Sequence, residues 1–325
     1  MRQELQGLST RSLLVWLLER RRQNALQIHR QESQKFGCKS MISNINRILI
    51  LVLLLLVPLL CGCVSQEEPP TGKINVATTI APLGDFVTAV GGDKVEVTVL
   101  VPPGAEPHTY EPAPSQMKDV ALANLYIMNG GGLEFWMDKV LQVNRDMLIV
   151  DSSRGVKLVN ESGGETDPHI WISLRNAAIQ VNNICSALIK VDPANGKYYL
   201  KNRDDYLQKL KALDEDLNRT FAAKSGRIFI AYHPAWTYFA RDYNLDQVPI
   251  LENEKEPGPK YLGSIIDLAK RNNITVIFIE PQYNPKSAEV IAQEIKAKVV
   301  ALDPLGPNYL ENMQYSGQEI ARSLK

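Results

Sequence analysis

From residue 73 onward, short apolar runs alternate with longer amphipathic segments, and this alternation restricts the fold more than any other feature of the sequence. The apolar runs are rich in Val, Ile and Leu, which predicts buried strands separated by helices. Strands that alternate with helices form parallel sheets, because the crossover helices cover both faces of the sheet. The predicted strands are 74–79, 95–101, 125–128, 147–150, 227–231, 247–251, 275–279 and 299–302.

The segments between these strands carry apolar residues at three- and four-residue steps, which is typical of helices packed on a sheet. The first predicted helix ends at Gly91 and Gly92, since glycine readily adopts the left-handed conformation that terminates a helix. The predicted helices are 82–90, 115–123, 133–143, 175–190, 236–241, 261–271, 285–296 and 309–324.

Residues 192–224 are too long for an ordinary crossover helix. Asp192 and Pro193 are typical of a helix start, and no helix breaker follows Gly196. About thirty helical residues span roughly 45 Å. A coiled-coil arm is the rival interpretation, but the apolar repeat is too short and irregular for one. We therefore predict two Rossmann-like α/β lobes with parallel sheets, residues 73–191 and 225–325, joined by a long connecting helix.

The first 72 residues carry targeting signals. Residues 48–60 form an apolar run that is short for a permanent membrane span but typical of a signal peptide. Gly62 precedes Cys63 in a sequence that resembles a prokaryotic lipobox, so we interpret residues 41–63 as a lipoprotein signal peptide and Cys63 as the lipidated residue. Residues 64–72 are polar and proline-rich, as expected of a tether.

Two further expectations follow for this region. Residues 1–40 fit poorly ahead of a signal peptide, and Met41 begins a complete one, so residues 1–40 are interpreted as a gene-model extension. An uncleaved N-terminal anchor is the alternative to a lipid anchor. With either anchor, the rest of the chain is expected at the outer face of the cytoplasmic membrane, extracytoplasmic or periplasmic.

Composition excludes several classes of function. The formal net charge is zero, so the chain has no overall positive charge that would favour binding to nucleic acid. Four cysteines, of which Cys185 lies far from the others, form neither a disulfide framework nor a CxxC metal site. GxSxG, HExxH and phosphate-binding loop motifs are missing from the sequence. We expect a monomer that is not an enzyme.

The three histidines that follow Cys63 share one setting. His108, His169 and His233 each adjoin a proline in a loop between predicted elements. Proline restricts the backbone, so a side chain beside it is positioned before an ion arrives. Neutral imidazole is a good ligand for zinc and other first-row divalent ions. Because 61 and 64 residues separate successive histidines, only the tertiary fold can bring them together.

Carboxylates at strand ends supply candidates for a fourth ligand. Ligands of open parallel sheets bind beyond the carboxyl ends of the strands, and Asp303 directly follows strand 299–302. We predict one metal site made of three histidines and Asp303, with two ligands from each lobe. Glu280 also follows a strand, and either replaces Asp303 or orients an imidazole from behind. Glu111 lies close to His108 and is a further candidate for tuning it.

Several segments resemble the metal-binding receptors of zinc- and manganese-type ABC importers. The similar segments are 104–112, 167–171, the strand-end His233 and 301–305. The resemblance implies one divalent ion in a cleft between two lobes, ligand roles for His108, His169, His233 and Asp303, and a permease with a cytoplasmic ATPase as partners.

A third histidine is typical of the zinc receptors in this family, whereas manganese receptors often have glutamate there, so His233 favours Zn²⁺. Many zinc receptors also carry a histidine-rich loop, but residues 152–166 contain no histidine. Mn²⁺ therefore remains the alternative ion. Two other functions stay open: a zinc-dependent extracytoplasmic hydrolase, and a surface adhesin that uses the same fold.

Overall fold

The computed structural model describes residues 72–160, 164–251 and 255–325, which belong to one compact unit that begins at Thr71. The predicted gene-model extension, the signal peptide, the lipidated Cys63 and nearly all of the tether lie outside the described residues. Within the described ranges, the helices are too short or too polar to cross a membrane.

The first sheet has four parallel strands in the order β2-β1-β3-β4. The central strand β1 is buried on both faces because helices pack on each side, as its apolar sequence predicts. The elements of this half are β1 (Ile74–Thr78), α2 (Ala81–Gly91), η2 (Gly92–Lys94), β2 (Val95–Val99), α3 (Pro114–Ala121), β3 (Leu125–Met128), α4 (Met137–Val143), β4 (Leu148–Asp151) and η3 (Ile170–Ile172).

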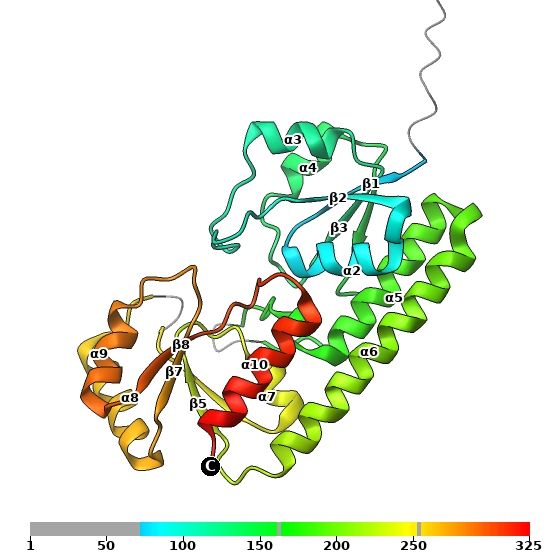
Figure 1. Ribbon diagram of the computed structural model, residues 1–325. Coiled ribbons are helices and arrows are strands. Elements are labelled where there is room, and N and C mark those ends of the chain that lie inside the picture. Colours follow the sequence, from blue (N-terminus) through cyan, green and yellow to red (C-terminus); the bar gives the residue numbers. More distant parts are fainter. Residues whose placement is uncertain (1–71, 161–163, 252–254) are drawn as a thin grey trace, which may run out of the picture. The chain divides into compact units, whose positions relative to one another are not determined.

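The second sheet repeats this topology in the order β6-β5-β7-β8, again with parallel strands (Figure 1). Its elements are β5 (Ile228–Ala231), α7 (Thr237–Tyr243), β6 (Asp246–Pro249), α8 (Pro259–Asn272), β7 (Val276–Ile279), α9 (Lys286–Ile295), β8 (Lys298–Ala301) and α10 (Tyr309–Ser323). The predicted class, two α/β lobes with parallel sheets, is confirmed.

Two long helices connect the sheets: α5 (Leu174–Val191) and α6 (Gly196–Ala222), with η4 (Pro193–Asn195) between them. The 27 residues of α6 span roughly 40 Å. Helix α6 packs on α5 and α2 at one end and on α7 and α10 at the other, so the predicted connecting helix is confirmed (Figure 1). A Cβ on Gly317 would lie 2.5 Å from a methyl group of Leu217, so glycine allows α10 to approach α6 closely.

A single apolar core runs from the first sheet through α5 and α6 to the inner face of the second sheet. Side chains of β5 alternate between two cores: Phe229 faces this shared core, and Ile230 faces a smaller one beneath α8 and α9. Complete burial of an apolar side chain of this size stabilises the folded state by about 1.5–3 kcal/mol. The shared core therefore opposes independent movement of the two sheets.

Helix α4 differs from its predicted extent. It begins at Met137 instead of residue 133, because the preceding residues form a turn in which Gly130, Gly131 and Gly132 all have positive φ. The buried carboxylate of Glu134 accepts hydrogen bonds from the amides of Asn129 (2.6 Å) and Gly130 (3.1 Å) and stabilises this turn. The glycine run is thus a turn, as its lack of a phosphate-loop lysine indicates.

Candidate metal centre

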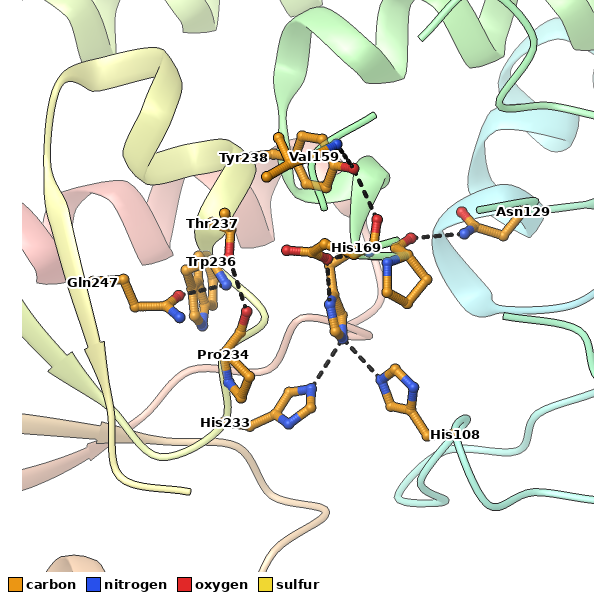
Figure 2. A network of polar contacts seen from close by, with 12 residues as sticks. His108, Asn129, Val159, His169, His233, Pro234, Trp236, Thr237, Tyr238 and Gln247 are labelled. Atoms are coloured by element: carbon orange, nitrogen blue, oxygen red, sulfur yellow. Dashed lines mark hydrogen bonds and ion pairs between the residues drawn. The ribbon is translucent and has the colours of Figure 1, made fainter. Parts of the chain in front are cut away.

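The three histidines come from three loops and meet between the two sheets. His108 lies between β2 and α3, His169 lies between β4 and α5, and His233 follows β5. The Nε2 atom of His169 is 2.9 Å from Nε2 of His108 and 2.9 Å from Nε2 of His233 (Figure 2). One ring nitrogen from each of the three histidines lies within 4.8 Å of the others.

These nitrogen positions fit a small divalent ion. Zinc–nitrogen bonds of 2.0–2.1 Å in a tetrahedron place the ligand nitrogens about 3.3 Å apart. The two distances to His169 Nε2, 2.9 Å each, are a few tenths of an ångström shorter than this spacing. Three neutral imidazoles are a donor set suited to zinc and to other ions of the first transition row.

His169 is held by a buried carboxylate. Its Nδ1 lies 2.8 Å from Oδ1 of Asp167, and its backbone amide donates to the same oxygen at 2.9 Å. Burial raises the pKa of Asp167, but the hydrogen bonds and charge of His169 outweigh it and leave the pKa below its usual value. A carboxylate can only accept, so Nδ1 carries the proton and Nε2 presents its lone pair to the ion.

Both lobes fix the backbone around His169. Asn129 Nδ2 donates to the carbonyl of Pro168 at 2.8 Å, and the Tyr238 hydroxyl donates to the carbonyl of Asp167 at 2.8 Å (Figure 2). On the other side, Trp171 Nε1 donates to the carbonyl of Pro304 at 2.8 Å. The side chain of His169, 3 % exposed, is consequently the most firmly positioned part of the site.

His233 is supported by the loop that follows β7. Its Nδ1 lies 3.0 Å from the Tyr283 hydroxyl, and the two rings stack with centroids 5.1 Å apart. The backbone amide of His233 donates to Glu280 at 3.3 Å, and Trp236 Nε1 donates to the other oxygen of Glu280 at 3.3 Å. Burial raises the pKa of Glu280 to about 7, although His233 and the hydrogen bonds lower it.

His108 is the most exposed of the three histidines. Its side chain is 26 % exposed, and its Nε2 lies 3.8 Å from Oε1 of Glu106, which also accepts the backbone amide of His108 at 3.0 Å. Glu111, predicted to tune His108, is exposed and forms an ion pair with Lys139 of α4. The ring of His108 is therefore the one of the three that solvent reaches most easily.

Asp303 lies close by but outside the histidine group. Its Oδ1 accepts hydrogen bonds from Gln282 Nε2 (2.9 Å) and from the backbone amide of Leu305 (2.9 Å). Among the described residues, the group with ligand atoms within 4.8 Å contains neither Asp303 nor Glu280. The structure thus brings together three of the four predicted ligands, whereas the fourth carboxylate is held by its neighbours.

Several residues that position the site were not assigned a role from the sequence. The role of Asp167 could have been predicted from the sequence, because a carboxylate two residues before a histidine can reach both the amide and the ring of that histidine. Tyr283 and Gln282 follow a strand end and were open to the same reasoning as Glu280. No feature of the sequence points to Asn129 or Tyr238, since their contacts with residues 167 and 168 depend on the tertiary fold.

A family model described as zinc-uptake complex component A periplasmic matches residues 76–323. The chain belongs to this family. It is 34% identical over 252 residues to the high-affinity zinc uptake system protein ZnuA of Bacillus subtilis, a match that covers 72% of this chain and 79% of the relative. It is also 29% identical over 304 residues to PsaA of Streptococcus anginosus, a manganese ABC transporter substrate-binding lipoprotein, covering 85% and 97% of the two chains.

Solved structures agree with the family assignment. A crystal structure of ZnuA superposes with a TM-score of 0.76 at 38% identity, covering 77% of this chain and 99% of the other. The laminin-binding protein Lmb of Streptococcus agalactiae, described as having adhesin and metal-transporting activity, superposes with a TM-score of 0.73 at 28% identity, covering 78% and 100%. The family consists of substrate-binding components of ABC importers, so the chain is not an enzyme, and the hydrolase alternative is set aside.

Proposed function

We propose that the chain binds a divalent transition metal, most favourably zinc, outside the cytoplasmic membrane and delivers it to an ABC permease driven by a cytoplasmic ATPase. One observation carries this proposal: Nε2 of His108 and Nε2 of His233 each lie 2.9 Å from Nε2 of His169, and Asp167 fixes the proton of this central imidazole on Nδ1. Lipid on Cys63 would keep this monomeric receptor at the membrane surface.

The choice of zinc rests on the donor set. Manganese is a harder ion that prefers carboxylate and water oxygens, whereas three imidazoles suit zinc. The relatives include both zinc and manganese proteins, so relationship alone does not select the ion. His108, His169 and His233 are proposed as ligands. Asp303 lies outside this histidine group, and its Oδ1 accepts hydrogen bonds from Gln282 and Leu305.

The arrangement also suits capture followed by release. An imidazole must be neutral to bind a metal, so affinity should fall as the pH falls. The shared core between the sheets favours small loop movements over a wide closure. A difference of a few kcal/mol between loaded and empty loops is enough for a permease to distinguish them.

Titration of the metal-stripped protein tests this function. Zinc and manganese are each added in competition with a chelator of known affinity. We expect one site per chain and a preference for zinc, and a strong loss of zinc binding in His169→Ala. Unchanged zinc affinity in that variant would refute the site, whereas a preference for manganese would overturn the ion assignment alone.

A further inference from the structure

Gln282 connects the histidine pocket to Asp303. It lies in the loop between β7 and α9 and lines the same pocket as His108, His169 and His233. Its Nε2 donates to Oδ1 of Asp303 at 2.9 Å. Its Oε1 is buried and has no hydrogen-bond partner among the described residues. One end of this amide is thus engaged, and the other is an unsatisfied acceptor.

Buried acceptors are nearly always satisfied in native proteins, so an orphan carbonyl beside a binding pocket needs an explanation. A water that enters with the ion provides one, because metal-bound water is a strong hydrogen-bond donor. The carbonyl of Gln282 suits a ligand shell in which water occupies one position. It suits less well a shell in which a carboxylate fills that position.

The opposite end of the amide acts on Asp303. Two N–H donors, from Gln282 and from the backbone of Leu305, share Oδ1 of this carboxylate. Hydrogen bonds to a charged acceptor are stronger than neutral ones, so they oppose movement of the carboxylate towards an ion. The backbone donor is fixed by the loop, whereas the Gln282 donor can be removed by substitution.

We propose that Gln282 sets the metal preference by holding Asp303 outside the coordination shell, which leaves the ion three imidazoles and one position for water. The inference rests on the proposed function of the histidine site. Zinc accepts four ligands that include several nitrogens, whereas manganese loses more when a carboxylate is withheld. Gln282 is therefore a specificity-determining residue that acts by keeping Asp303 out of the ligand shell and by accepting a hydrogen bond from water in that shell.

Neighbouring residues are poorer candidates for this role. Tyr283 and Glu280 contact His233 itself, so their substitution disturbs a ligand together with the fourth position. The hydrogen bond of Gln282 reaches Asp303 instead of a histidine. A change at Gln282 therefore tests the fourth position while the three imidazoles keep their supports.

Three variants of the purified protein test whether Gln282 keeps Asp303 away from the ion: Gln282→Ala, Asp303→Asn and the double substitution. Zinc and manganese affinities are measured by chelator competition, and cobalt is added as a spectroscopic probe, since four-coordinate Co²⁺ absorbs visible light far more strongly than six-coordinate Co²⁺. In Gln282→Ala we expect the zinc-to-manganese affinity ratio to fall at least about tenfold, because the carboxylate becomes free to bind manganese. The cobalt bands should weaken.

Asp303→Asn is the matched control, since its amide oxygen still accepts both N–H donors. It should leave zinc affinity and the cobalt bands nearly unchanged, and in the double variant it should restore the wild-type ratio. An unchanged ratio in Gln282→Ala would overturn the proposal, as would a loss of zinc affinity beyond about tenfold in Asp303→Asn. If Gln282→Ala does not fold, the Asp303→Asn result decides alone. Failure of the wild-type protein to bind either metal would instead refute the proposed function.

Discussion

His169 and His108 contribute equivalent nitrogen atoms to one centre, yet they are held in very different ways. His169 is 2 % exposed and lies in a segment that hydrogen bonds tie to both lobes. The side chain of His108 is 26 % exposed, and Glu106 of the same loop accepts its backbone amide. The site therefore combines a buried, fixed ligand with a partly exposed one.

This difference has a functional meaning. A receptor must bind its ion tightly and later release it, which a fully rigid shell opposes. A buried ligand with a charged partner is positioned in advance, so little ordering is needed when the ion binds. A partly exposed ligand on a loop offers a route by which the ion enters and leaves. We expect the two sides of the centre to respond differently to substitution.

The largest effect is expected from removing the fixed ligand. His169→Ala should weaken zinc binding at least about a thousandfold, roughly 4 kcal/mol. His108→Ala should cost roughly a hundredfold, because water can replace a ligand more easily at an exposed position. Chelator competition measures both affinities, and circular dichroism of the metal-free variants checks the fold. A loss in His108→Ala equal to that in His169→Ala would break the comparison.

A smaller effect is expected from the groups behind the ligands. Asp167→Asn should lower zinc affinity by about 10–100-fold, because the amide no longer fixes the proton of His169 on Nδ1. Glu106→Gln is the matched change beside His108 and should cost less than about fivefold, since its ring contact of 3.8 Å is long. Equal losses in the two variants would show that His108 is positioned as firmly as His169.

The last effect concerns the stability of the protein instead of metal affinity, and it tests how the turn behind His169 is held. Glu134 stabilises the turn that carries Asn129, which in turn holds the carbonyl of Pro168. Burial raises the pKa of Glu134 to about 7, although hydrogen bonds from Thr79, Asn129 and Gly130 lower it. Folding therefore favours the protonated form of this carboxyl.

The direction in which stability changes with pH follows from the protons bound by the folded and unfolded states. Between the ordinary pKa and about 7 the folded state holds the proton that the unfolded state releases, so stability falls as the pH rises through this window. From pH 5 to 7.5 the loss from Glu134 should be about 2 kcal/mol. Urea unfolding of the metal-free protein measures it. Glu134→Gln should be less stable at pH 5 and flatter with pH; an equal slope in both proteins would contradict the expected shift.

Much of the fold was predictable because it depends on local patterns. Each of the eight strands lies where an apolar run predicted it, with ends that differ by a few residues. The long helix was predictable from the absence of breakers after Gly196. The start of α4 was not, since its preceding turn depends on a buried contact between Glu134 and the amides of residues 129 and 130.

The site divides in the same way. The available imidazoles could be identified without a structure, because only three histidines follow Cys63 and each lies beside a proline in a loop. How they are held depends on the tertiary fold, through Asp167, Tyr283 and the contacts of both lobes with the segment around His169. It also decided the position of Asp303, because its hydrogen bond with Gln282 joins residues 21 positions apart. Residue types and strand ends are local properties of a chain, whereas hydrogen bonds between distant loops form only when the sheets have folded.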